Sequence, residues 1–384
     1  SRIGLVPQDD VLHRQLTVRE ALGYAAELRL PPDTTRADRE EVIARVLGEL
    51  QLTEHAGTRV DRLSGGQRKR ASVALELLTG PSLLILDEPT SGLDPALDRQ
   101  IMTTLRRLAD SGRVVLVITH SLSYLELCDQ VLLLAPGGKT AYVGPPGEVG
   151  TALGSSDWAE IFARVAAEPD AVHAEHLARS ATVDHPPAAA PGPLGRPAHT
   201  SRRRQLSTVA RRQIRLIRAD RGYLIFLSLL PFILGGLSIL VPGSDGFGPP
   251  SPGADPGELA FILILLILGA CFMGSSLTVR DLVGERMIYH RERAAGLAPS
   301  AYLIAKIVVF CAAAIVQSFV LVLVVLVGKG APGAGSVIPS GSVELVVDIA
   351  LTTCACVVVG LALSAVARSG EQVMPLLVVT VMVQ

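Results

Sequence analysis

Charged residues are scarce in this chain. Only 18% of its 384 residues are Asp, Glu, Lys or Arg, whereas 49% are hydrophobic, and the formal net charge at pH 7 is −1. Disordered proteins carry more charge and fewer apolar residues, so this composition excludes disorder of the whole chain. The length allows two or three domains.

Cysteine is scarce too, and no Cys-x-x-Cys pair occurs. We therefore expect neither a disulfide scaffold nor a zinc site. Instead, we predict that all five cysteines are small buried hydrophobic side chains, namely Cys128, Cys271, Cys311, Cys354 and Cys356. The chain begins with neither a Met nor a signal peptide, and its last apolar run continues to Gln384, so we expect a piece of a longer protein.

Long uncharged runs dominate residues 222–384, whereas residues 1–180 are typical of a soluble α/β domain. As helices these runs would reach roughly 28–33 Å, which is about the thickness of the hydrocarbon core of a membrane. Buried core helices rarely run so far without a charge. We therefore predict membrane spans at Gly222–Pro242, Leu259–Val279, Ile307–Gly328 and Ile349–Ala367, with a fifth beginning at Val373.

Basic residues alternate between the segments that join these spans. Eight arginines lie between Arg202 and Arg221, before the first span, and a second basic group from Arg280 to Lys306 follows the second span. The loop 243–257 has no Lys or Arg. The positive-inside rule therefore predicts a multi-pass protein of the cytoplasmic (inner) membrane, with the N-terminal half in the cytoplasm and this loop outside.

Two polar features near the spans each allow two interpretations. The arginine-rich segment 202–221 also contains Ile214, Leu216 and Ile217. We favour an amphipathic helix on the inner leaflet, held by acidic membrane lipids, over an ordinary stop-transfer flank. Gln317 could line a substrate path, but we favour a hydrogen bond between two helices.

The soluble half contains two short apolar runs, Ser82–Leu86 and Val114–Ile118, each of which follows a stretch with helical periodicity. Strands that alternate with helices indicate a parallel sheet, whose chemistry gathers at the carboxyl ends of the strands. Asp87, Glu88 and His120 fall at those ends. One carboxylate there can hold Mg²⁺, and a second can polarise the attacking water in phosphoryl transfer.

A glycine pair precedes the helix that leads into the first of these strands. Ser64 is a natural N-cap, and Gly65 and Gly66 let a ligand approach the backbone. The free N–H groups and the helix dipole favour an anion such as a phosphate. A plain helix cap is the alternative for this motif taken alone.

Five motifs in this half resemble those of the ATP-binding cassette (ABC) family, in the family's order and spacing. They are a glutamine loop at Val6–Asp10, a signature motif at Leu63–Gln67, a Walker B strand at Leu83–Pro89, a D-loop at Ser91–Asp94 and a switch histidine at His120. The resemblance implies an α/β P-loop-type ATPase domain followed by an all-α transmembrane domain.

The resemblance extends into the membrane half. The segment Gly284–Leu297 looks like the coupling helix region of the G-type exporters, in which the ATPase precedes six spans on one chain. The chain is most similar to the actinobacterial exporters whose ATPase follows phosphothreonine-reading forkhead-associated domains. Those domains, and a phosphothreonine-regulated partner, would lie outside this chain.

The resemblance also implies roles for single residues. Gln8 would contact Mg²⁺, Asp87 would hold it through water, and Glu88 would be the catalytic base. His120 would contact the γ-phosphate of ATP, and Asp94 would bridge the two ATPase halves. The nucleotide held by a partner subunit would be bound by Ser64, Gly65, Gly66 and Gln67.

A Walker A loop, Gly-x-x-x-x-Gly-Lys-Ser/Thr, does not occur in the chain. Gly138-Lys139-Thr140 resembles its end, but its Pro-Gly-Gly setting between two apolar runs predicts a hairpin turn. We expect the true loop to precede Ser1 and the chain by itself to be inactive as an ATPase.

We therefore predict the central part of a half-transporter that exports a substrate at the expense of ATP, and the resemblance implies a dimer, either a homodimer or one copy paired with a relative. The predicted parts are an ATPase domain at 1–150, an extension at 151–201 with a linker at 183–200, a surface helix at 202–221, and about five of six spans at 222–384. A two-component flippase and a signalling protein that moves a partner without transport are the alternatives. No nucleic-acid partner is expected, and an amphipathic or lipidic substrate is favoured.

Overall fold

The computed structural model describes residues 3–180, 201–248, 257–333, 335–372, 375, 377 and 378. These residues form two compact units. The first unit holds residues 3–10, 46–52 and 63–180, and the second holds residues 11–45, 53–62 and those from 201 onward. The predicted linker at 183–200 and most of the predicted fifth span lie outside the described residues.

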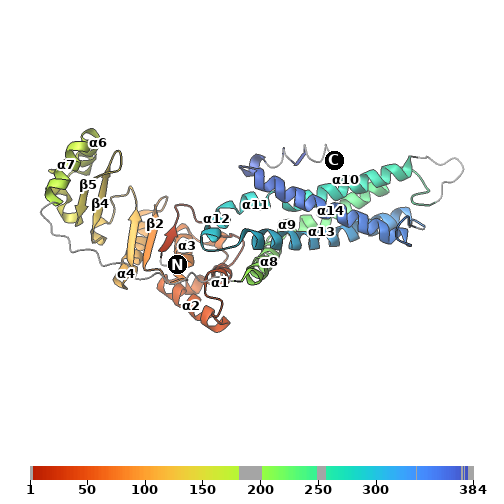
Figure 1. The fold of residues 1–384 in the computed structure, drawn as a ribbon, viewed down its shortest axis with the longest axis horizontal. Coiled ribbons are helices and arrows are strands. Elements are labelled where there is room, and N and C mark those ends of the chain that lie inside the picture. The colour runs from red at the N-terminus through yellow and green to blue at the C-terminus, as the bar shows by residue number, and fades with distance from the viewer. Residues whose placement is uncertain are drawn as a thin grey trace. The chain divides into compact units, whose positions relative to one another are not determined.

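A parallel sheet forms the centre of the first unit (Figure 1). Its strands, in spatial order, are β1 (Ile3–Val6), β2 (Leu83–Asp87) and β3 (Val114–Ile118). The helix α3 (Gly65–Leu77) packs against β1 and against α4 (Pro95–Asp110), which covers β3. The predicted strands and their parallel arrangement are confirmed, so Asp87, Glu88 and His120 lie at one edge of the sheet.

A second, smaller core completes the first unit. The strands β4 (Val131–Ala135) and β5 (Lys139–Gly144) are antiparallel, and the helices α5 (Val149–Leu153), α6 (Trp158–Ala167) and α7 (Pro169–Ser180) follow them. Gly137 and Gly138 have φ values of 81° and 73° in the turn between the strands. The hairpin prediction is therefore confirmed, and Lys139 begins a strand instead of a helix.

The second unit contains the apolar helices and the segments around them. It begins with α1 (Val18–Arg29) and most of α2 (Arg36–Glu49), followed much later in the chain by the arginine-rich α8 (Arg202–Ala219). Four helices are long and apolar enough to cross a membrane, namely α9 (Arg221–Ile239), α10 (Glu258–Thr278), α13 (Pro299–Lys329) and α14 (Gly341–Val366). Two short helices, α11 (Asp281–Gly284) and α12 (Arg286–Ala294), connect α10 to α13. Short 3₁₀ turns complete the chain at Thr53–His55, Val60–Arg62, Leu125–Leu127 and Pro146–Glu148.

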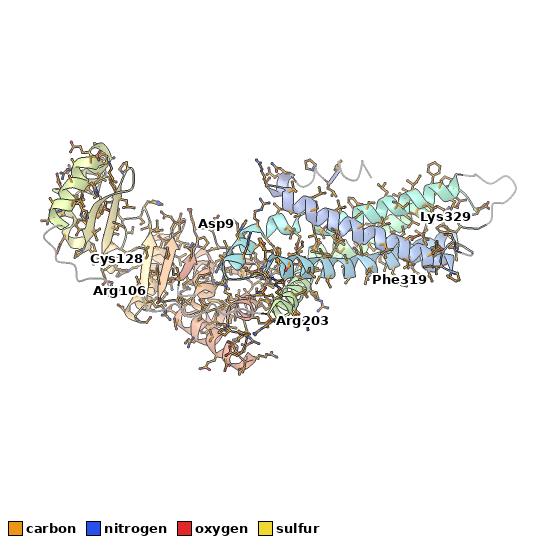
Figure 2. All side chains as sticks on the ribbon, in the orientation of Figure 1. Asp9, Arg106, Cys128, Arg203, Phe319 and Lys329 are labelled. Carbon is orange, nitrogen blue, oxygen red and sulfur yellow. The ribbon has the colours of Figure 1, made fainter. Side chains whose placement is uncertain are left out.

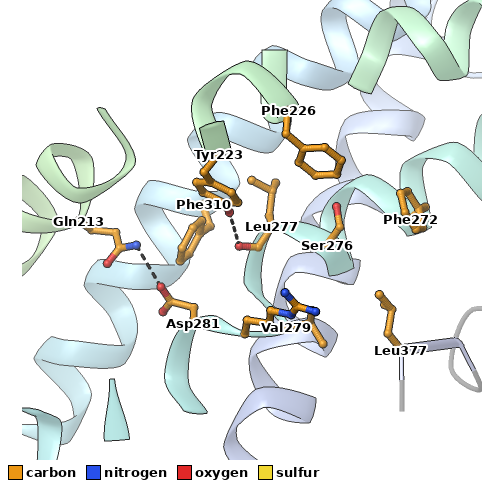
Figure 3. A pocket seen from close by; sticks show the side chains of 11 residues that line it. Gln213, Tyr223, Phe226, Phe272, Ser276, Leu277, Val279, Asp281, Phe310 and Leu377 are labelled. Carbon is orange, nitrogen blue, oxygen red and sulfur yellow. Dashed lines mark hydrogen bonds between the residues drawn. The ribbon is translucent and has the colours of Figure 1, made fainter. Parts of the chain in front are cut away.

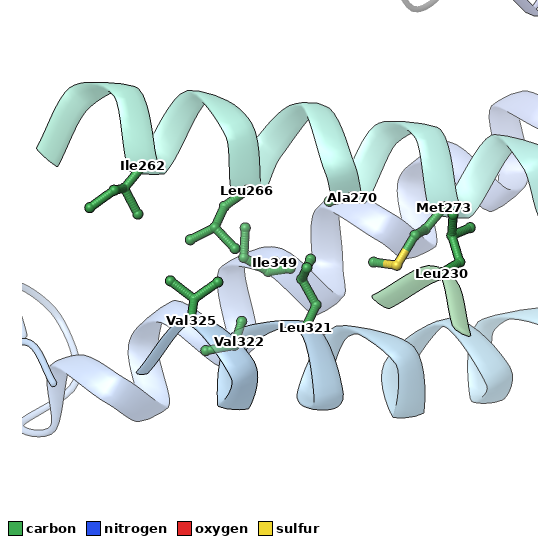
Figure 4. Close-up of a cluster of buried hydrophobic side chains, with 9 residues drawn as sticks. All are labelled: Leu230, Ile262, Leu266, Ala270, Met273, Leu321, Val322, Val325 and Ile349. Carbon is green, nitrogen blue, oxygen red and sulfur yellow. The ribbon is translucent and has the colours of Figure 1, made fainter. Parts of the chain in front are cut away.

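Two apolar clusters show that the four long helices run alternately up and down. One cluster joins the beginnings of α9 and α13 to the ends of α10 and α14 through Leu227, Phe310, Leu277 and Leu361. The other lies further along the bundle and includes Ile262, Leu266, Val325 and Ile349 (Figure 4). The four predicted spans are confirmed, but α13 and α14 are longer than predicted and include Lys306, Lys329, Glu344 and Asp348.

Glycine allows α10 and α14 to approach closely. A Cβ on Gly274 would lie 2.3 Å from the carbonyl oxygen of Thr353, and one on Gly360 would lie 2.3 Å from Oγ1 of Thr278. Both distances are shorter than any real contact, so larger side chains here would push the two helices apart.

The setting of α8 differs from the prediction. The helix forms, but one face of it is buried within the protein, at Gln205, Thr208, Val209, Arg212, Gln213 and Leu216. This face packs on α13 and α1. An amphipathic pattern indicates that one face of a helix is covered, but it does not show whether lipid or protein covers it. In α8 the buried face packs on protein, whereas the prediction placed it against membrane lipid.

Two smaller predictions have mixed outcomes. Cys271 and Cys356 are buried as predicted, but Cys128, Cys311 and Cys354 are partly exposed (Figure 2 labels Cys128). None of these five cysteines forms a disulfide. The favoured interpretation of Gln317 is confirmed, because its Nε2 donates a 2.7 Å hydrogen bond from α13 to the carbonyl of Leu227 in α9.

Candidate functional site

The N-terminus of α3 is held by a reciprocal pair of hydrogen bonds. The backbone N–H of Gln67 donates to Ser64 Oγ at 3.3 Å, and the backbone N–H of Ser64 donates to Gln67 Oε1 at 3.0 Å. This capping box confirms Ser64 as the N-cap. Gly65 is exposed at the start of α3. The helix dipole and the free backbone N–H groups there are suited to binding an anion.

The predicted base and switch residue meet at the edge of the sheet. Glu88 Oε1 accepts a 3.0 Å hydrogen bond from the backbone N–H of His120 and lies 2.7 Å from His120 Nδ1. The His120 side chain is 83% exposed, whereas that of Glu88 is 17% exposed. Two neighbouring parallel strands thus bring an oriented carboxylate beside an accessible imidazole.

Glu88 also has an unusual backbone, with φ of 45°. A non-glycine residue in this left-handed region is strained, and such residues cluster at functional sites. Its N–H donates to the carbonyl of Ile118 at 2.8 Å, which ties the strained residue to the end of β3.

Asp87 and Asp94 occupy different settings. Asp87 ends β2 and is half-buried, with no salt bridge to any described residue. Asp94 is the N-cap of α4, and its Oδ1 accepts 3.0 Å hydrogen bonds from the N–H groups of Ala96 and Leu97.

The donor set at this edge fits Mg²⁺. No cluster of three or more His, Cys, Asp or Glu side chains suited to a metal occurs among the described residues. Mg²⁺ does not need such a cage, because it is usually held by one or two carboxylates together with waters and phosphate oxygens. Asp87 and the neighbouring Glu88 offer those carboxylates.

Lys69 is a buried cation that sequence reasoning did not single out. Its Nζ donates to the carbonyl oxygens of Pro7 at 3.1 Å and Gln8 at 2.8 Å, and lies 3.9 Å from Asp10 Oδ1. Burial lowers the pKa of Lys69, and the carboxylates of Asp10, Asp9 and Asp87 oppose that shift. The side chain of Gln8 remains exposed.

A second group of charges is buried in the second unit, where α11 and α12 meet α13. Lys306 Nζ lies 2.6 Å from Asp281 Oδ2 and 2.7 Å from Glu285 Oε2, and the Lys306 side chain is fully buried. The prediction placed Lys306 before the third span, in the basic group that follows the second span. That placement is wrong, because α13 begins at Pro299 and carries Lys306 as a buried residue.

The predicted coupling segment contacts residues that follow Gln8 in the chain. Arg291 Nη1 donates to the carbonyl of Val11 at 2.9 Å, and His13 Nδ1 lies 3.6 Å from Glu285 Oε1. Glu292 of α12 pairs with the buried Arg212 of α8 through two hydrogen bonds, one of them 2.9 Å long.

Charge pairs also join α8 to α1. Arg215 Nε donates to Glu20 at 2.6 Å, and Thr208 Oγ1 donates to Glu27 at 2.8 Å. Arg211 pairs with the same Glu27. Residues 11–29 are thus bound to the helix that precedes the first span, and three of the arginines predicted to meet lipid instead meet carboxylates.

Burial controls the pKa of two groups in this region. Burial and the nearby Arg212 lower the pKa of His13 to about 4, against the opposing effect of Glu285. Burial would raise the pKa of Glu285, but Lys306, His13 and Arg212 outweigh it and lower that pKa to about 2. His13 is therefore neutral and Glu285 ionised at neutral pH.

A cavity of about 430 Å³ lies at the same end of the long helices (Figure 3). Aromatic and aliphatic side chains form most of its wall, and Gln213, Ser276, Arg280 and Asp281 add polar groups. Figure 3 shows Gln213 bonded to Asp281, and Tyr223 bonded to the backbone of Leu277. The cavity is suited to a molecule with a large apolar part and a small polar one.

Comparisons with known proteins agree with both halves. Residues 1–91 match the family of ABC transporters, and residues 204–384 match the ABC-2 type transporters. The chain is 64% identical over its full length to the ABC transporter ATP-binding/permease protein Rv1747 of Mycobacterium tuberculosis, of which it covers 45%.

More distant relatives match a smaller share of the chain. ABC transporter G family member 28 of Arabidopsis thaliana is 45% identical over 37% of the chain and 14% of the relative. The broad substrate specificity ATP-binding cassette transporter ABCG2 of Bos taurus is 41% identical over 38% of the chain and 23% of the relative. The chain spans less than half the length of these relatives.

The chain is thus a membrane-embedded protein in which an ATP-binding region precedes a helical membrane region. It belongs to the ABC transporters, with the ATPase-first arrangement of the G type.

Proposed function

We propose that this chain couples ATP hydrolysis to export across the cytoplasmic membrane, as one half of a dimer. The observation that carries the proposal is the contact of Glu88 with His120 at the carboxyl edge of the sheet, in a chain that also holds four apolar helices. In this proposal the ATPase domain comprises residues 1–150, an extension 151–201 follows it, α8 leads into the spans, and the membrane domain comprises 222–384.

The proposed chemistry assigns one task to each residue. Glu88 takes the proton of the attacking water, and His120 orients the γ-phosphate. Mg²⁺, held near Asp87 and Gln8, would neutralise charge on the phosphates. Ser64, Gly65, Gly66 and Gln67 face the nucleotide of the partner, with Asp94 between the two halves.

Hydrolysis would reach the spans through residues that follow Gln8. Movement of Gln8 is passed along the chain to Val11 and His13, which contact Arg291 and Glu285 of the coupling segment. Glu285 in turn holds Lys306 of α13. The path therefore runs through polar contacts that are partly or fully buried.

The cavity supports an amphipathic or lipidic substrate, because most of its wall is apolar and a few polar side chains complete it. A phosphothreonine-regulated partner remains part of the proposal on the family resemblance alone. We also propose that these 384 residues do not hydrolyse ATP by themselves, because they contain no Gly-x-x-x-x-Gly-Lys-Ser/Thr loop to cradle the phosphates.

The full-length protein with Glu88→Gln tests the proposal. The amide keeps the size of the side chain and loses the base, so ATP should still bind while hydrolysis falls by about 10²-fold or more. Phosphate release and ATP binding are measured in lipid nanodiscs. Turnover close to that of the wild type would refute the role of Glu88, and turnover that no added amphipathic compound changes would favour a signalling role over export.

A further inference from the structure

Lys69 connects two elements to which the proposed function gives separate tasks. It lies on α3, whose N-terminal residues would meet the nucleotide of the partner subunit. Its ammonium group donates hydrogen bonds to the backbone carbonyl oxygens of Pro7 and Gln8. These two residues belong to the loop that would meet the subunit's own Mg²⁺.

Three features distinguish this contact from an ordinary surface lysine. The Lys69 side chain is only 6% exposed, so its charge is enclosed by protein. Both carbonyl oxygens come from one short loop, which fixes the direction of the backbone there. Gln8 itself is exposed, so the contact holds its backbone and leaves its side chain able to reach a ligand.

We propose that Lys69 is a positioning residue that sets the place of Gln8 relative to the nucleotide's metal and transmits shifts of α3 to the Gln8 loop. The inference rests on the proposed function of Gln8 and of the α3 N-terminus. Lys69 touches no reacting atom and acts through Gln8 alone. A small displacement of a positioned group is enough to slow a reaction strongly.

The test compares Lys69→Met with Gln8→Ala in the full-length protein in nanodiscs. The readout is the Mg²⁺ concentration that gives half-maximal hydrolysis at saturating ATP. We expect Lys69→Met to raise this midpoint by about tenfold and to lower kcat by a similar factor, as displacement of a positioned ligand predicts. Lys69→Arg, which keeps a buried donor, should restore most of the wild-type midpoint.

A double variant shows whether Lys69 acts through Gln8. If it does, Gln8→Ala and Gln8→Ala with Lys69→Met have the same Mg²⁺ midpoint, because the second change has nothing left to position. Arg113→Met is the matched control, since it removes the 3.1 Å contact of Arg113 with Glu49 at the far end of β3 and leaves the Gln8 loop alone. That control should change the melting temperature without changing the midpoint.

Two results would overturn the inference. One is a Lys69→Met protein that loses stability as the Arg113→Met control does and keeps the wild-type Mg²⁺ midpoint. The other is a double variant whose midpoint shift equals the sum of the two single shifts. The proposed function fails separately, if Glu88→Gln still hydrolyses ATP; an inactive Glu88→Gln with an unshifted Lys69→Met refutes the role of Lys69 alone.

Discussion

His13 is a buried side chain surrounded by charged groups. Its ring lies beside Glu285, with Arg212 and Lys306 near enough to oppose a positive charge on it. The folded protein therefore favours the neutral imidazole. A buried neutral histidine makes stability depend on pH, because the unfolded chain takes up the proton first.

The sign and the pH window follow from the two pKa values. The pKa of His13 is about 4 in the folded protein and about 6.5 in an unfolded chain. Stability should therefore fall as pH drops from 6.5 to 4, by at most on the order of 3 kcal/mol at ~1.4 kcal/mol per pKa unit.

Melting temperatures of the full-length protein in detergent, measured between pH 7 and pH 4.5, check this. His13→Gln should flatten the dependence on pH, because the glutamine does not titrate. His290→Gln changes an exposed histidine of α12 and should leave the dependence as it is in the wild type. Equal slopes for His13→Gln and the wild type would show that His13 is not the group that titrates.

At the scale of elements, α12 is held at two places by different means. Arg286 Nη2 donates to the carbonyl of Ala367 at 2.7 Å, just after α14, and Glu292 pairs with Arg212 of α8. The helix thus joins the segment before the first span to the end of the fourth. A movement of α12 would therefore be transmitted to α8 and to the end of α14.

Changing Arg286 and Glu292 together to Ala should therefore uncouple the spans from ATP hydrolysis. ATPase activity should persist while the ATP-dependent movement of the spans is lost. The movement is measured as the distance between spin labels on the exposed Val337 of the two copies. Unchanged ATPase activity together with an unchanged ATP-dependent distance would refute the coupling role.

Two controls separate coupling from folding. Arg293→Ala removes an exposed arginine of the same helix and should change neither quantity. Arg212→Leu with Glu292→Leu removes a buried pair without leaving one charge alone, which avoids the loss of roughly 3–5 kcal/mol that breaking such a pair costs. This variant should fold and still be uncoupled.

The elements also show which features local sequence reveals. Features that depend only on residues adjacent in the chain were predicted correctly. They are the helix cap at Ser64, the ends of β2 and β3, and the hairpin turn at Gly138. The bonds of Lys69 join residues 61 and 62 positions apart, and the position of Lys306 depends on how α13 packs on α11. No local pattern encodes those contacts. For α8 the pattern predicted the helix but not its buried face, which is mostly polar and includes Gln205, Thr208 and Gln213.

For the whole molecule, the proposed site is composite, because Glu88 and the α3 N-terminus of one chain serve different nucleotides. A symmetric dimer then has two equivalent sites, each built from both copies. This arrangement distinguishes a dimeric ATPase from two ATPases that only lie side by side.

Gly65→Asp removes the signature contribution without harming the helix. An acid in the first turn is favourable to α3, whereas its charge repels a phosphate at that place. The added Cβ meets only the end of the flexible Leu93 side chain, at 3.0 Å. Full-length Gly65→Asp and full-length Glu88→Gln should each be inactive as homodimers.

Mixing the two inactive proteins should restore hydrolysis. In a mixed dimer one site carries both lesions, and the other combines an intact Glu88 with an intact signature. Each mixed dimer has one complete site of two, so purified mixed dimers should hydrolyse ATP at roughly half of the wild-type rate. The two proteins are co-expressed with different tags, purified over both, and assayed for phosphate release. Purified mixed dimers without activity would show that Glu88 and Gly65 of the same copy serve one nucleotide, and the composite site would have to be abandoned.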